Sequence, residues 1–110
     1  MPKFKILGEF DGDQIPHVVP PDYSERARLA VRPGMRYTIV LFAHDREHGG
    51  VVASAVVRRA IARIPLEASL LAVGADFTKE ATELLHARKA AIARIGEFGW
   101  TDASYHSVRS

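Results

Sequence analysis

Apolar and polar residues follow a strand, loop and helix pattern that occurs twice in the second and third quarters of this chain. Residues 37–42 and 69–74 are continuous apolar runs, and helical apolar spacing over 51–64 and 79–89 follows them. A strand that is buried on both faces has such a continuous run, as in parallel sheets covered by helices. The pattern predicts an α/β fold in which these two strands lie side by side and point the same way.

The N-terminal residues predict a β-hairpin. Residues 4–10 have the pattern of a strand, Asp11-Gly12-Asp13 that of a turn, and residues 15–19 that of the partner strand. Pro16 has no N–H to donate to a ladder, so this second strand is expected at the edge of the sheet.

A short helix is expected between the hairpin and the first long strand. Asp22 is followed three residues later by Glu25, the spacing of a capping box, which predicts a helix over residues 23–31. Arg32-Pro33-Gly34 then ends it, because proline cannot continue a helix.

The C-terminal part allows two interpretations. Thr78 is expected to cap the last helix, and this helix either runs to Ile95 or ends near residue 89 and is followed by a strand over 91–95. We favour the strand, since the segment after it then forms a loop. Residues 103–110 are expected to be a frayed tail.

Together these elements predict one small α/β domain of 110 residues. Its mixed sheet has parallel central strands and an N-terminal hairpin, with helices packed on the sheet. The chain has no cysteine, no apolar stretch of bilayer length and no secretory signal, so the prediction is a cytoplasmic protein that does not enter the membrane. An esterase serine turn and the glycine-rich loops of common nucleotide sites are also absent from the sequence.

The net charge is only +2, which is weak for a dedicated nucleic-acid binder. One segment differs: the helical stretch 51–64 carries Arg58, Arg59 and Arg63 and no acidic residue. Its polar side is either an ordinary solvated helix face or a stripe that contacts phosphates.

Three loops are expected at the carboxyl ends of the parallel strands, where open α/β sheets bind ligands. The first contains two imidazoles and two carboxylates, groups that bind divalent metal or exchange protons: His44, Asp45, Glu47 and His48. Their spacing fits no specific metal motif, and a solvated turn is the simpler interpretation.

Further candidates border this loop. Gly49 and Gly50 lead toward a helix N-terminus, where free N–H groups can bind an anion, although they also suit a plain turn. Asp76, in the second loop, is a capping residue or a metal ligand. Trp100, in the third loop, either fills the open end of the core or offers a stacking surface.

About forty residues resemble the C-terminal half of restriction-endonuclease-like domains of the methyl-directed restriction enzymes. The matching pieces are a helix, a short strand, a phenylalanine-threonine-x-glutamate-alanine helix start and a last strand, here Val56-Val57-Arg58-Arg59-Ala60, Ser69-Leu70-Leu71-Ala72-Val73-Gly74, Phe77-Thr78-Lys79-Glu80-Ala81 and Ile92-Ala93-Arg94-Ile95. The resemblance implies a nuclease-like fold.

The catalytic residues of that family are not present. The family has an acid-x-lysine triplet at the end of the strand before the central helix, and this chain has Leu41-Phe42-Ala43-His44 there, with no such triplet elsewhere. The carboxylates of these sites hold Mg²⁺, so nuclease activity is not expected.

The leading hypothesis is therefore a non-catalytic interaction or nucleic-acid-associated domain with a degenerate nuclease-like fold, which forms a homodimer or binds a nucleic-acid or protein partner and needs no cofactor. The alternative is a metal-dependent hydrolase that uses the residues of the first loop with a divalent metal.

Overall fold

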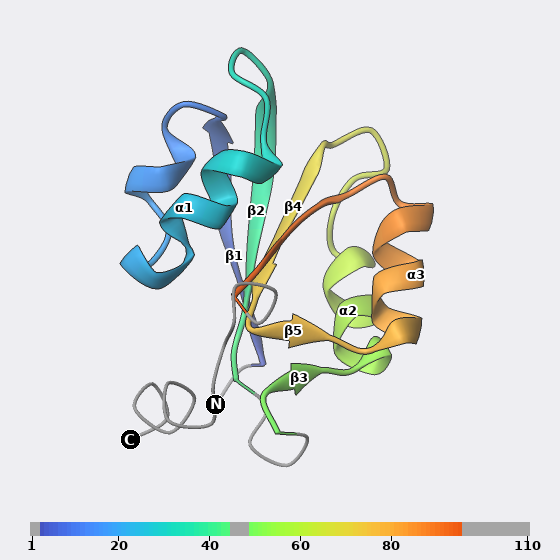
Figure 1. Ribbon diagram of the computed structural model, residues 1–110. Helices are drawn as coiled ribbons and strands as arrows, with labels where there is room; N and C mark the ends of the chain where they lie inside the picture. The colour runs from blue at the N-terminus through green and yellow to red at the C-terminus, as the bar shows by residue number, and fades with distance from the viewer. Residues whose placement is uncertain (1–2, 45–48, 96–110) are drawn as a thin grey trace.

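A four-stranded mixed sheet lies between two layers of helices (Figure 1). The computed structural model describes residues 3–44 and 49–95. The strand order is β1-β2-β4-β6, with bounds Phe4–Asp11, Arg36–Phe42, Leu70–Gly74 and Ala91–Arg94. The predicted α/β class, with its mixed sheet and parallel central strands, is confirmed.

β2 and β4, the two strands predicted to be parallel neighbours, do pair in parallel. β2 pairs with β4 in parallel from Thr38 opposite Leu70 to Leu41 opposite Val73, and β6 adds to the other side of β4, also in parallel. β4 is buried along its whole length, as its continuous apolar sequence predicts.

The predicted N-terminal hairpin is wrong in its second strand. Ile15–His17 form a short 3-10 helix, and β1 pairs antiparallel with β2 instead. Pro16 occupies the first turn of this helix, where its missing N–H costs nothing and its fixed φ is favourable. Ile15 is fully buried beneath it, so the apolar residue that suggested a strand fills the core from a helical turn.

Helix α1, Pro21–Ala30, begins two residues before the predicted start. Pro20 is its N-cap and Pro21 its first residue, and no side chain caps it, so the expected capping box does not form. The Ser24 hydroxyl instead donates to the Pro20 carbonyl at 3.2 Å. Val31 is extended, which ends the helix one residue before the predicted end.

The central helix, α2, is shorter than predicted because a small strand precedes it. α2 spans Ser54–Ile61, and β3 (Val51–Val52) pairs in parallel with β5 (Asp76–Phe77) in a second, two-stranded sheet. The N–H groups of Arg63 and Ile64 donate three residues back, which carries the chain to the buried Ile64 in a tighter turn.

Helix α3, Lys79–Ala87, has the predicted cap. The Ala81 N–H donates to Oγ1 of Thr78 at 3.1 Å. At its other end Lys89 has a positive φ of 58°, and the Ala90 N–H donates to the Leu85 carbonyl at 2.9 Å. This closing bond turns the chain back toward the sheet, and the preferred interpretation of the next segment, a strand, is confirmed by β6.

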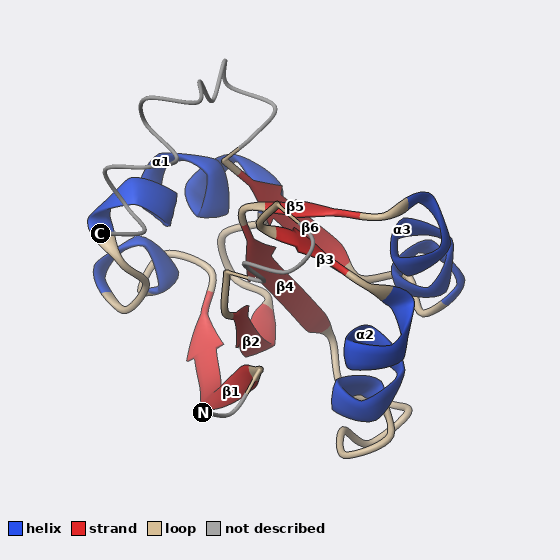
Figure 2. Ribbon diagram, turned by 90° about the horizontal axis from the view of Figure 1, so that it is seen from below, coloured by secondary structure: helices blue, strands red, loops and turns tan. Residues whose placement is uncertain are grey.

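Each face of the sheet has its own core, and the helical layers lie on opposite sides (Figure 2). α2 and α3 cover one face, where Val40 and Ala72 of the sheet meet Val57 and Leu85 of the helices. α1 and the 3-10 helix cover the other, with Ile39 and Leu71 among the buried residues.

Arg88 fixes the turn between α2 and β4. Its guanidinium donates to the carbonyls of Leu66 (3.0 Å) and Ala68 (3.2 Å) and also to that of Pro65. The turn itself is closed by the Ala68 N–H on the Pro65 carbonyl at 3.1 Å. One side chain thus supplies donors to three carbonyls of the same turn.

We expect Thr78→Ala to lower the free energy of unfolding by about 1 kcal/mol, because the first turn of α3 loses the acceptor for the Ala81 N–H. Thr78→Ser keeps the hydroxyl and should stay within a few tenths of a kcal/mol of the parent. Urea unfolding of the three proteins measures both differences, and an equal loss in the two variants would contradict a capping role.

Candidate functional site

The carboxyl ends of β2 and β4 lie at one edge of the sheet, at the bottom of Figure 1. The segment that follows the first predicted loop meets the second loop there. β3 follows the first loop and β5 contains part of the second, and Val51 pairs directly with Asp76. The strand directions thus bring the end of residues 44–50 beside the second loop, as the parallel arrangement predicts.

Only part of the predicted metal cluster lies in the described residues. His44 follows β2 and is half-buried, whereas Asp45, Glu47 and His48 lie outside the described residues. Among residues 3–44 and 49–95, no group of three or more histidine, aspartate or glutamate side chains could hold a metal ion. The metal site stays a prediction.

Asp76 has a local structural role. One of its carboxylate oxygens, Oδ1, accepts a hydrogen bond from the Phe77 N–H at 2.8 Å, at the start of β5. This is the turn role that was weighed against metal binding in the sequence. Asp76 is half-buried, and it still lies at the rim.

The other rim candidates differ in their placement. Gly49 and Gly50 have positive φ angles of 65° and 89°, which favour glycine. β3 separates them from α2, so they do not lead directly into the helix as the sequence predicted. Trp100 and the third loop lie outside the described residues.

Arg58 and Arg59 of α2 are exposed, as is Arg63 just after the helix. The opposite side of α2 is buried through Val56, Val57 and Ala60. Arg63 follows the helix, and its guanidinium carbon lies 5.8 Å from the centre of the Phe4 ring on β1. This cation–π contact joins the end of the arginine segment to the first residue of the edge strand.

We call the three exposed arginines Arg58, Arg59 and Arg63 the basic face. Lys3 and Lys5 are also exposed, but they flank Phe4 on the strand and do not belong to this face. Phe4 pairs with Phe42 of the core on the α2 side, whereas Lys5 pairs with Leu41, which packs against the core on the α1 side. The sequence predicted these arginines, and the fold adds the contact of Arg63 with Phe4, almost sixty residues away.

The basic face is suited to bind anions rather than to perform catalysis. α2 has no acidic residue, and the nearest acid along the chain is the exposed Glu67 in the turn that follows. A guanidinium is charged at every physiological pH and pairs well with phosphate oxygens. A surface of this kind can bind phosphate groups.

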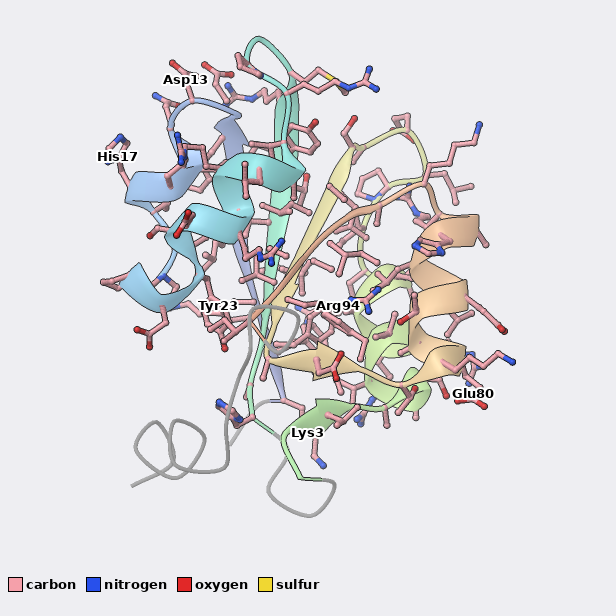
Figure 3. The ribbon with its side chains drawn as sticks, in the orientation of Figure 1. Lys3, Asp13, His17, Tyr23, Glu80 and Arg94 are labelled. Carbon is pink, nitrogen blue, oxygen red and sulfur yellow. The ribbon has the colours of Figure 1, made fainter. Side chains whose placement is uncertain are left out.

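One buried titratable side chain lies on the other side of the sheet. Tyr23 of α1 is buried, and this desolvation, together with the charge of Asp22, raises the pKa of its phenol above the ordinary value of 10.0. Figure 3 shows Tyr23 on the α1 side of the sheet, and α2 with its arginines covers the opposite face. It does not belong to either candidate site.

No family model, curated protein or solved structure matches this chain. In the described residues, no helix is both long enough and apolar enough to cross a bilayer. The functional argument therefore depends on the geometry of the rim and of the basic face.

We expect Mn²⁺, Mg²⁺ and Zn²⁺ to leave the melting temperature unchanged, because the described rim offers only His44 and an Asp76 that is engaged with Phe77. A ligand that binds only the folded state must raise this temperature. Thermal melts with each metal and with EDTA measure the effect. A rise of several degrees that His44→Ala abolishes would favour the hydrolase.

We expect Tyr23 to make the protein less stable at alkaline pH. The folded state holds the phenol proton more tightly than the unfolded state, so this contribution is complete below the unfolded pKa near 10 and is lost as pH rises through the folded value. Tyr23→Phe should flatten the decline of unfolding free energy above about pH 10. Identical pH slopes in parent and variant would contradict this assignment.

Proposed function

We propose that this chain is a non-catalytic, nucleic-acid-associated domain whose basic face contacts the phosphate backbone. The observation that carries the proposal is the set of exposed arginines on α2 and just after it. The helix has no acid, and Arg63 reaches β1 through its contact with Phe4. The small net charge of +2 makes this local concentration of cations the more distinctive.

The arrangement of the cations suits a backbone contact. Arg59 and Arg63 are four residues apart, so they share one side of the helical segment, and the contact of Arg63 with Phe4 directs that side toward β1. Arginines that neutralise phosphates release counterions, which gives binding that is independent of sequence and sensitive to salt. Non-specific binding of this kind has dissociation constants of about 10⁻⁴ to 10⁻⁶ M at physiological salt.

The nuclease-like part of the proposal is supported by the order of the elements. α2, β4, α3 and β6 follow one another as in the family that the sequence resembles, and the Phe77-Thr78 pair opens α3. At the end of β2, Phe42 is buried in the core and Ala43 is exposed, so neither supplies a carboxylate or an amine. This supports a domain without nuclease chemistry.

We include the cytoplasm and a homodimer in this proposal. A chain without cysteine needs no oxidising compartment, which agrees with the cytoplasm. A second copy would double the number of cations available to one nucleic acid and strengthen weak binding. The metal-dependent hydrolase remains the second candidate, favoured by the pairing of Val51 with Asp76 at the rim.

We expect Arg58→Glu/Arg59→Glu to weaken binding to short duplex DNA and RNA by at least tenfold at low salt. Both side chains are exposed, so the variant should fold like the parent. The slope of log K against log salt should fall in magnitude by about two, which is about one for each phosphate contact removed. Fluorescence anisotropy over a salt series measures both quantities.

Lys79→Glu/Lys89→Glu is the matched control, because it changes the net charge by the same amount at exposed positions around α3. This control should retain most of the binding. Equal losses in the two variants would reduce the effect to overall charge, and no binding by the parent would refute the nucleic-acid proposal.

A further inference from the structure

We propose that the outer face of α1 binds the same face of a second copy of this chain, with the two helices antiparallel. The outer face consists of Asp22, Glu25, Arg28 and Leu29, together with Arg32 just after the helix. The inference concerns self-association alone and does not depend on nucleic-acid binding.

The outer face presents an apolar side chain that the fold does not use. Leu29 is 63% exposed, and it is one of only three large hydrophobic residues exposed in the described residues. Tyr23 and Ala27 bury the inner side of the same helix. A leucine between charged neighbours on a rigid helix is a suitable centre for a small helix–helix contact.

The charges on this face are complementary to themselves. Asp22 and Glu25 lie in the first half of α1, and Arg28 lies in the second half, with Arg32 beyond it. All four are exposed, and no ion pair involving any of them is found in the described residues. Two such helices repel when parallel and attract when antiparallel, which is the condition for a twofold contact.

The helical rise gives a register for this pairing. If the twofold axis is level with Ala27, each Glu25 lies within about one residue rise, 1.5 Å, of the other Arg28. Each Asp22 then lies just beyond the end of the other helix, where the extended Val31 leads to Arg32. The two Leu29 residues are then about 6 Å apart along the axes, four rises of 1.5 Å. Their side chains can meet between the ion pairs.

The open edge of β1 is less suited to self-association. Lys3 and Lys5 stand near its beginning, and the register shifts between Ile6 and Gly8, which bends the edge. Lysines and bulges are common protections against edge-to-edge pairing. The helical face has no such protection.

Sedimentation velocity in dilute salt, without nucleic acid, tests the inference. A contact of one helix pair is small, so association is expected in the micromolar range or weaker, and the parent is followed up to about 200 μM. Glu25→Arg and Arg28→Glu should each weaken dimerisation by at least tenfold. The double variant Glu25→Arg/Arg28→Glu should restore it, because it exchanges the charges and keeps the net charge.

Two further measurements separate this contact from others. A mixture of the Glu25→Arg and Arg28→Glu proteins should form heterodimers although neither associates well alone. Leu29→Glu should abolish the dimer, whereas Leu66→Glu, at an 84% exposed leucine elsewhere, should not. A parent that stays monomeric, single variants that dimerise normally, or a double variant that is not restored would each overturn the inference.

Discussion

The parallel pairing of β2 with β4 is the constraint on which the rest of this structure depends. Parallel neighbours cannot be joined by a tight turn, so the chain between them must cross the sheet, and α2 is that crossing. The buried residues of the two strands alternate between the two cores, Val40 and Ala72 on one side and Ile39 and Leu71 on the other. Helices are therefore needed on both faces, and the loop after β2 must end at the rim.

The position of α2 in turn determines where its arginines lie. The cation–π contact of Arg63 with Phe4 is at the edge of the sheet, and the Phe4 ring continues into the core through Phe42 (6.3 Å) and then Phe77 (5.5 Å). A Cβ on Gly74 would lie 3.0 Å from the Phe77 ring, so the aromatic row needs a glycine beside it. Arg63, at the end of the basic face, thus contacts a ring that is packed into the core.

The sequence was sufficient where signals are local and strong. Continuous apolar runs identified β2 and β4, and Thr78 identified the start of α3, because burial and capping follow from neighbouring residues. The sequence was not sufficient where tertiary contacts decide the local structure. The apolar Ile15 fits both a strand and a 3-10 turn, and only the pairing of β1 with β2 excludes the strand.

The candidate sites show the same limit. Two-residue β3 exists because Val51 meets Asp76 from a distant part of the chain, and its apolar residues also fit the helical spacing that predicted a longer α2. The arginines were visible in the sequence, but the contact of Arg63 with Phe4 depends on the fold. Asp45, Glu47, His48 and Trp100 lie outside the described residues, so their predicted roles stay predictions.

The layering also relates the two proposals. α1 and α2 cover opposite faces of the sheet (Figure 2), so a dimer through α1 would leave both basic faces accessible. Two weak phosphate-binding surfaces held in one assembly can engage a long nucleic acid far more tightly than either alone.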